Sequence, residues 1–323
     1  MVCKSHSASW VFVCLGILLF LNGKWALGAD FPDKSVRVIV NYAPGSGADA
    51  EARGITPYVQ KHLGVSVNIE NVPGADGRIG LSRLWKSKSD GYTLIIHTTT
   101  MSLVGETLFN PEYRVADLSH IYSWSRTNMV LTVNIETYKT FDEFVKAGRE
   151  RQLSAGLPGR GSLSHLLGSM LTDELGLKVK WVPFDGGGEA LAALAGKHID
   201  FAVGGSTTAL PLVKGGKLRP LLVLADRKDS VYPDVPLAKN AGLKLSFFAA
   251  IRGVDGPPKM LPQVVKILED AFAKAAKEPE YMAWAQQKRM LDVVPLDQEE
   301  YAKAIEEQQK LIEKYKDVLK QDK

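Results

Sequence analysis

The chain has 323 residues, of which 45% are hydrophobic, and a formal net charge of +4. This length and composition are typical of a soluble globular protein with two ordinary domains or one large α/β unit. The near balance of 40 basic and 36 acidic residues argues against nucleic acid as a partner, which would need lysine and arginine clustered on one face.

The N-terminus has the pattern of a secretory signal peptide. A basic residue, Lys4, is followed by an apolar run at residues 10–21, and small residues at 26–29 offer a cleavage site. The run is shorter than the roughly 20 residues that a membrane-spanning helix needs. We therefore expect residues 1–29 to be removed and the mature chain to be exported to the periplasm.

Both cysteines, Cys3 and Cys14, lie in this leader. The mature chain would have neither a disulfide nor a cysteine metal ligand, and its net charge would fall to +2, since two lysines and no acid are lost. A lipid anchor on Cys14 is disfavoured, because Val13 stands where a lipobox has a small residue.

From position 36 onward, short β-branched runs alternate with longer helical patterns. The predicted elements are, in chain order, strand 36–42, helix 49–63, strand 65–70, helix 77–88, strand 93–97, strand 153–157, helix 162–175, strand 179–182, helix 189–195, strand 200–204 and strand 218–225. Alternation of strand and helix predicts parallel sheets, and the two blocks predict two α/β lobes.

After Gly253 the pattern becomes mainly helical. Helices are predicted from Pro262 to about 277, over 281–288 and along the C-terminus, and a proline suits a first helical turn. We expect this tail to return to the first lobe, which would give two crossing segments and a hinge, near 128–133 and 249–253. The predicted organisation is a signal peptide at 1–29, a discontinuous first lobe at 30–130 plus 251–323, and a second lobe at 131–250.

Three glycine-rich turns, at 43–49, 156–162 and 184–189, each follow a predicted strand and lead into a helix. Glycine lets the backbone approach a ligand closely, and the free N–H groups of a first helical turn bind an anion with the help of the helix dipole. A carboxylate suits such a cradle. The alternative is that these glycines only permit tight strand-to-helix turns.

The first turn also matches a dinucleotide fingerprint. Gly45-x-Gly47-x-x-Ala50 follows a strand and opens a helix, and Glu70 lies about where a ribose-binding acid belongs. An exported nucleotide-dependent oxidoreductase is therefore the competing hypothesis. It is weakened by the leader, which directs the chain away from the compartment where NAD is plentiful.

The sequence offers little support for other catalytic motifs. The histidines outside the leader show no H-x-x-x-H spacing, and no G-x-S-x-G elbow occurs, so neither a metal site nor a serine hydrolase is indicated. His165, one turn into a predicted helix, could face a cleft or make a structural hydrogen bond. We expect no enzymatic activity, no cofactor and no metal.

Several motifs resemble the substrate-binding receptors of tripartite tricarboxylate transporters, also called Bug receptors. The first is Pro44-Gly45-Ser46-Gly47-Ala48-Asp49 followed by Ala52-Arg53; the others run from Asn71 to Gly80, with an N-x-P-G-A-x-G-x-I-G pattern, and from Asp90 to Leu94. The second half is similar through Gly159-Arg160-Gly161-Ser162, Val182-Pro183-Phe184 and Lys214-Gly215-Gly216-Lys217-Leu218-Arg219. The resemblance covers nearly all of the mature chain.

This resemblance implies a two-lobed periplasmic-binding-protein fold, type II-like, with a ligand cleft between the lobes. It implies a solute-binding receptor, a monomer, that captures a small organic carboxylate and delivers it to the membrane subunits of such a transporter. The family holds the carboxylate on a loop of each lobe, so the matching positions are Ser46, Gly47, Ala48, Asp49, Gly161, Ser162, Ser164 and His165. The third glycine-rich turn adds Asp185, Gly186 and Gly187 as candidate ligand contacts.

Three departures leave the identity of the carboxylate open. Ser46 replaces a glycine of the family motif, Asp185 occupies a variable position, and the usual tryptophan before the second crossing is missing. Arg53 is expected to form a structural ion pair rather than to bind the ligand. Asp49 is expected to cap its helix, although an acid there could also receive a ligand ammonium group.

Overall fold

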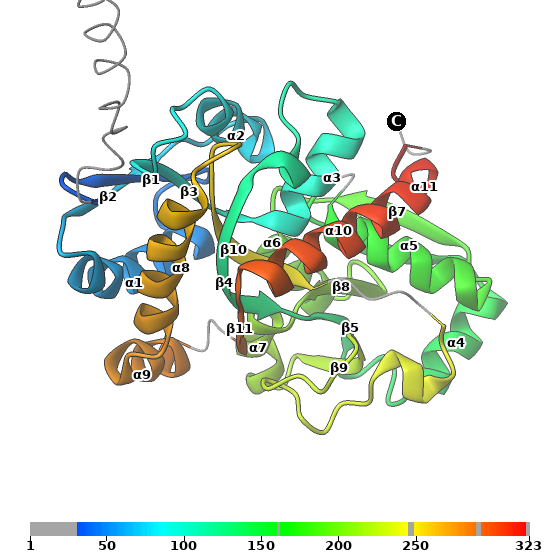
Figure 1. Cartoon of the computed structure of the whole chain (residues 1–323). Helices are drawn as coiled ribbons and strands as arrows, with labels where there is room; N and C mark the ends of the chain where they lie inside the picture. Colours follow the sequence, from blue (N-terminus) through cyan, green and yellow to red (C-terminus); the bar gives the residue numbers. More distant parts are fainter. Residues whose placement is uncertain (1–30, 160–161, 245–248, 289–291, 321–323) are drawn as a thin grey trace, which may run out of the picture.

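The computed structural model describes residues 31–159, 162–244, 249–288 and 292–320. Among them are two β-sheets with helices packed on both faces, arranged side by side (Figure 1). None of the helices in these ranges is long and apolar enough to cross a membrane.

The first sheet has six strands in the order β11-β4-β10-β3-β1-β2. β1, β2 and β3 are parallel, whereas β10 runs antiparallel between β3 and β4, and β11 runs antiparallel to β4 at the edge. The strands are β1 (Val36–Val40), β2 (Val67–Asn71), β3 (Thr93–Thr98), β4 (Ser119–Thr127), β10 (Ala250–Gly256) and β11 (Asp292–Leu296).

The second sheet has five strands in the order β7-β6-β8-β5-β9. β6, β7 and β8 are parallel, and β5 runs antiparallel between β8 and β9. The strands are β5 (Met129–Asn134), β6 (Leu153–Leu157), β7 (Val179–Pro183), β8 (Phe201–Gly205) and β9 (Leu218–Leu224). Each sheet thus has three parallel strands in the order second, first, third, followed by one antiparallel strand and then by two further strands in the first sheet and one in the second.

The expectation of purely parallel sheets is wrong, because each sheet receives an antiparallel strand next to a crossing. β4 continues into β5 through Asn128, so one extended segment belongs first to one sheet and then to the other. The return runs from the end of β9 to β10, which begins at Ala250. The first strand after each crossing, β5 or β10, runs opposite in direction to the parallel strands of its new sheet.

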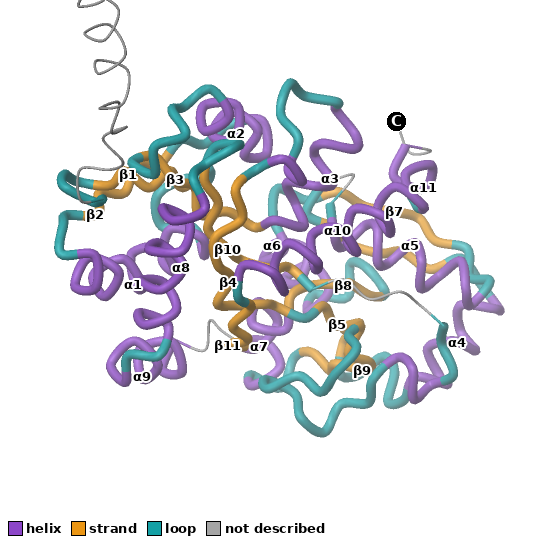
Figure 2. Tube along the Cα trace, viewed as in Figure 1, coloured by secondary structure: helices purple, strands orange, loops and turns teal. Residues whose placement is uncertain are grey.

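Both faces of the first sheet are buried by helices (Figure 2). Val38 and Val40 pack with α1 and α8, whereas Ile39 between them faces the opposite cluster, as the twofold alternation of a strand requires. That opposite face carries α3 and α10, which contact each other and, respectively, β10 and β4. The helices involved are α1 (Gly47–Leu63), α3 (Thr99–Phe109), α8 (Pro262–Ala276) and α10 (Gln298–Lys314).

A single apolar cluster connects the two halves of the molecule. It includes Leu103 and Val104 on α3, Leu166 and Leu167 on α5, and Phe201 on β8. The short helix α11 also contacts α5. The remaining helices are α2 (Arg78–Trp85), α4 (Phe141–Glu150), α5 (Leu163–Leu175), α6 (Gly187–Ala195), α7 (Ser206–Lys214), α9 (Pro279–Lys288) and α11 (Lys316–Lys320).

Candidate functional site

Two matching turns stand at the carboxyl ends of β1 and β6, the first parallel strand of each sheet. Ser46 caps α1 by accepting a hydrogen bond from the Asp49 N–H at 3.2 Å, and Ser162 caps α5 by accepting one from the His165 N–H at 3.2 Å. Both caps have the same extended backbone, with φ near −70° and ψ of 162°. In open α/β sheets, ligands bind outside the carboxyl ends of the strands, where the chain connections diverge to opposite faces.

Asp49 holds the first turn together. Its carboxylate accepts hydrogen bonds from Gly45 N–H at 2.9 Å, from Arg53 Nε at 3.0 Å and from Asn71 Nδ2 at 2.9 Å. Burial alone would raise the pKa of this carboxyl, but the bonds from Arg53, Gly45 and Asn71 outweigh it and lower the pKa to about 2. The carboxylate is therefore ionised and fully engaged by the protein.

This arrangement corrects one expectation and confirms another. Ser46, not Asp49, is the N-cap of α1; Asp49 sits in the first turn and bonds back to Gly45 instead. Its bonding also leaves it poorly placed to receive a ligand ammonium group. The expected structural ion pair of Arg53 is confirmed, with 3.0 Å between Nε and the Asp49 carboxylate.

Backbone amides in the first turn of α1 are unpaired within the part of the chain that the structure describes. The N–H groups of Gly47 and Ala48 have no hydrogen-bond partner among the described residues, and a Cβ placed on Gly47 would meet nothing within 4 Å. α6 begins after Gly186 with no side-chain cap, so the amides of its first turn are likewise uncapped. Unpaired amides at the positive end of a helix dipole are suited to bind a carboxylate.

Among the described glycines of the three turns, two that lie outside the expected site have a backbone conformation that favours glycine. Gly45 has φ of +81° and Gly159 has φ of +89°, a region that other residues adopt with strain. Gly187 has an ordinary backbone, and its nearest neighbour to an added Cβ would be Thr208 at 4.0 Å. Gly187 is therefore not in a conformation that favours glycine, and Gly161 lies outside the described residues.

The candidate residues of α5 are more buried than those of α1. Ser164 is almost fully buried, and the fully buried His165 ring packs edge-on against Trp181 with 5.2 Å between ring centroids. This contact gives His165 a packing role, whereas the structural hydrogen bond considered for it stays a prediction.

The third turn carries negative charge. Asp185 is exposed, and its N–H donates to the Glu189 carboxylate at 3.3 Å, so two acidic side chains flank the start of α6. A carboxylate ligand at this turn would have to be held by the Gly187 and Gly188 amides against that charge. The turn is therefore less favourable for an anion than the turn at Ser46.

Two features of this region, Asn71 and the start of α7, were not predicted from the sequence. Asn71, at the end of β2, bonds both Asp49 and the Tyr42 carbonyl, at 2.9 and 3.0 Å, and so fixes the first turn from the side. α7 begins directly after β8 at Gly205, again without a side-chain cap. The Gly-Gly-Ser sequence at 204–206 was the available signal, because it repeats the strand, glycine, helix pattern of the other turns.

The acid that the competing dinucleotide hypothesis requires, Glu70, is already paired within the protein. Glu70 lies on β2, and its carboxylate is held by Arg83 through two hydrogen bonds of 2.5 and 3.0 Å, with Arg37 at 3.7 Å. A ribose-binding acid must accept bonds from the ligand, whereas this one is already paired. The described residues also contain no group of three side chains that could hold a metal ion.

A buried polar network lies deeper in the first sheet. Asp255 on β10 accepts from His97 Nε2 at 2.5 Å and from His120 Nδ1 at 2.7 Å, and Ser102 contacts His97 Nδ1 at 2.7 Å. The Tyr301 hydroxyl donates to the same carboxylate at 3.1 Å. Although serine, histidine and aspartate are in series, Ser102 on α3 and His97 on β3 are both buried, so the network has a structural role.

A protein-family model described as the tripartite tricarboxylate transporter family receptor matches residues 52–321. Among curated relatives, the UPF0065 protein in the gbd 5' region of Cupriavidus necator is 29% identical over 255 residues, covering 78% of this chain and 77% of that protein. Protein BugT of Bordetella pertussis is 27% identical over 274 residues, covering 81% and 84%.

Solved structures give the same picture. MatC from Rhodopseudomonas palustris with bound malate is 27% identical with a TM-score of 0.72, covering 90% of this chain and all of that one. A structure described as a periplasmic transporter is 28% identical with a TM-score of 0.74, covering 91% and 98%. A TctC solute-binding protein from Polaromonas, at 23% identity and a TM-score of 0.80 over 90% and 100%, supports the two-lobed fold.

Proposed function

This chain belongs to the tripartite tricarboxylate transporter receptor family and is a solute-binding receptor rather than an enzyme, and from this premise we propose how it binds its solute. A small organic carboxylate lies between the two lobes, held by the turn at Ser46 on the first lobe and by the turn at Ser162 on the second. The remaining expected contacts stay part of this proposal: Gly47, Ala48, Asp49, Gly161, Ser164, His165, Asp185, Gly186 and Gly187.

The observation that carries the proposal is the equivalence of the two turns. Each follows the first parallel strand of a sheet, each ends in a serine N-cap with the same backbone, and each opens a helix toward the carboxyl edge of its sheet. Two helix N-termini presented by two lobes can hold a carboxylate through backbone N–H groups. Asp49 contributes by fixing the first turn, with its charge balanced by Arg53.

A dicarboxylic acid is the ligand class that we favour. MatC, which has the same fold and 27% identity, is described with bound malate. A ligand with a carboxylate at each end would offer one to the uncapped amides of each lobe. The acids at Asp185 and Glu189 would then favour placing the first carboxylate at the Ser46 turn, away from them.

The cellular setting follows from the same premise. We propose that residues 1–29 are a signal peptide, that the receptor acts in the periplasm as a monomer, and that it delivers its ligand to the membrane subunits of a tripartite transporter. The two lobes would be 30–130 plus 251–323 and 131–250, with Asn128 at one crossing and the segment before Ala250 at the other.

A ligand screen tests the proposal. Thermal unfolding of the purified protein would be followed with malate, adipate, citrate, benzoate, aspartate and NAD. A ligand present at a hundred times its dissociation constant adds about 2.7 kcal/mol to the free energy of unfolding, which is readily measured. We expect stabilisation by a dicarboxylate; stabilisation by NAD alone would overturn the proposal.

A further inference from the structure

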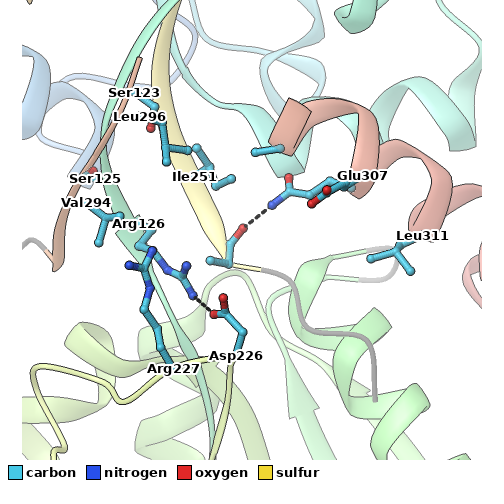
Figure 3. A pocket seen from close by; sticks show the side chains of 13 residues that line it. Ser123, Ser125, Arg126, Asp226, Arg227, Ile251, Val294, Leu296, Glu307 and Leu311 are labelled. Atoms are coloured by element: carbon cyan, nitrogen blue, oxygen red, sulfur yellow. Dashed lines mark hydrogen bonds and ion pairs between the residues drawn. The ribbon is translucent and has the colours of Figure 1, made fainter. Parts of the chain in front are cut away.

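A separate pocket of about 410 Å³ lies at the hinge (Figure 3). Its walls come from β4, β10, β11 and α10 of the first sheet's half and from Asp226 and Arg227, which follow β9 of the second sheet. None of its lining residues belongs to the three glycine-rich turns. The volume falls within the ~300–1,000 Å³ typical of small-molecule sites.

One end of the pocket carries an excess of positive charge. The guanidinium groups of Arg126 and Arg227 lie side by side facing the cavity, with Asp226 next to them (Figure 3). Arg126 donates to Asp226 at 2.7 Å and to Asn128 at 2.9 and 3.1 Å. Arg227 is exposed and forms no ion pair with any residue that the structure describes, so two cations share one carboxylate.

The rest of the pocket is lined by apolar side chains and by Ser123, Ser125 and Gln308, with one acid opposite the arginines. Ile251, Leu296 and Leu311 form the apolar wall. The Gln308 amide is already used, because it donates to the Ala249 carbonyl at 3.1 Å and accepts from Thr100 at 2.8 Å. Glu307, on the α10 side, is exposed and has no ion pair within the described ranges, so it would repel a second ligand carboxylate.

We propose that this hinge pocket is a second binding site, for a small organic monoanion with an apolar body. Its carboxylate is bound by the guanidinium groups of Arg227 and Arg126, a pairing with favourable fork geometry, and its apolar part lies against Ile251 and Leu296. Since the walls come from both sides of the hinge, an occupant contacts both lobes. Its binding and that of a cleft ligand would then be thermodynamically linked.

Calorimetry with three six-carbon probes tests the chemistry of this site on the full chain. Hexanoate supplies one carboxylate and an apolar chain, adipate adds a second carboxylate, and hexanol removes the charge. We expect hexanoate to bind at the hinge, and Arg227→Gln to weaken that binding by about tenfold or more, because a charge-assisted pair is lost. Lys228→Gln is the matched control, since Lys228 is an exposed neighbour that does not line the pocket, and it should bind hexanoate unchanged.

A second pair of variants separates this pocket from the proposed cleft. Gly47→Val, which fills the first cradle, should leave hexanoate binding intact, whereas Ala304→Leu, which fills the hinge pocket, should abolish it after unfolding curves confirm that the variant folds. No binding of hexanoate, equal binding by Arg227→Gln and the unmodified chain, or loss in Gly47→Val would overturn the proposal. The proposed cleft site is tested separately by dicarboxylate binding. If Gly47→Val is the only variant that loses dicarboxylate binding, the cleft site remains supported even when one of those three results overturns the hinge site.

Discussion

At the scale of single residues, the cradle at Ser46 is shaped by side chains that are hydrogen-bonded within the protein. Asp49 collects hydrogen bonds from three parts of the chain, the turn at Gly45, the next helical turn at Arg53 and the end of β2 at Asn71. Because those bonds satisfy the carboxylate, the free amides of Gly47 and Ala48 are left as the polar groups for an incoming anion. The specificity of the turn therefore lies in its backbone.

The carboxylate of Asp49 makes acid stability a test of this network. Its pKa of about 2 in the folded chain is below the ordinary 3.8, so its contribution to stability is present above pH 4 and is lost as the pH falls toward 2. We expect Asp49→Asn to lower the free energy of unfolding at pH 7 by roughly 1–3 kcal/mol, since the bonds to Arg53 and Gly45 weaken. Urea unfolding at pH 7 and pH 3 would measure this.

The Asn variant should also lose less stability than the unmodified chain between those two pH values. Equal losses in both proteins would show that Asp49 does not titrate as its hydrogen bonds require.

Two neighbouring glycines should respond differently to substitution. Gly45→Ala forces alanine to φ of +81° and should cost about 1–2 kcal/mol of stability. Gly47→Ala introduces a Cβ into open space at a helical position and should leave stability unchanged or slightly higher. Gly47→Val, by contrast, places a branched side chain at the cradle and should weaken dicarboxylate binding.

Denaturation and calorimetry on the same three variants would measure both effects. If Gly47→Val folds and binds a confirmed dicarboxylate as the unmodified chain does, the amides at that turn are not the binding groups.

At the scale of elements, the parallel strands were predictable and the crossing strands were not. β6 was predicted with the observed bounds, because a short apolar run between turn residues indicates a strand buried on both faces. β4 was missed, since Ser123, Ser125 and Arg126 interrupt its apolar residues, and β5 was missed although residues 129–131 form a short apolar run. α3 was missed because its first residues are threonines, which normally favour strands or caps.

Some residues of the candidate site were likewise found from the sequence, and others were not. Ser46 and Ser162 were found through the resemblance to the receptor family, whereas the role of Ser46 as the N-cap of α1 was not predicted, since Asp49 was expected there. The contribution of Asn71 depends on β2 pairing alongside β1, a contact between residues far apart in sequence that periodicity alone does not reveal.

Asp255 links four elements, and we expect its substitution to lower the free energy of unfolding strongly. Its carboxylate binds His97 on β3, His120 on β4 and Tyr301 on α10, and burial alone would raise its pKa, but the two histidines outweigh burial and hold the pKa well below the ordinary value. We expect Asp255→Asn to cost about 3–5 kcal/mol, since it leaves buried donors and charge without their partner. Tyr301→Phe, which removes one hydroxyl, should cost about 1 kcal/mol.

Equilibrium unfolding in urea would compare the two variants. A smaller loss in Asp255→Asn than in Tyr301→Phe would contradict the central place of the carboxylate.

At the scale of the whole molecule, the two sheets are joined by two segments and by an apolar contact. Asn128 passes the chain from β4 to β5, its side chain donates to Asp229 at 2.9 Å, and Arg126 ties Asn128 to Asp226 beyond β9. The two crossings are therefore bonded to each other, while Leu103 on α3 and Leu166 on α5 belong to one cluster across the halves. Such a pair of crossings permits rotation of one lobe against the other without breaking either sheet.

Closure of the lobes on a ligand is the prediction that belongs to this scale. If each lobe supplies one helix N-terminus to a dicarboxylate, the ligand binds the closed form more tightly and shifts the population toward it. Small-angle scattering with and without a confirmed ligand should then show a smaller radius of gyration at saturation. Arg126→Ala should weaken the link between the crossings and change the closed population, while leaving both cradles intact. An unchanged radius at saturation, in a sample whose binding is verified by calorimetry, would show that the lobes are already fixed in the position set by the α3 and α5 contact.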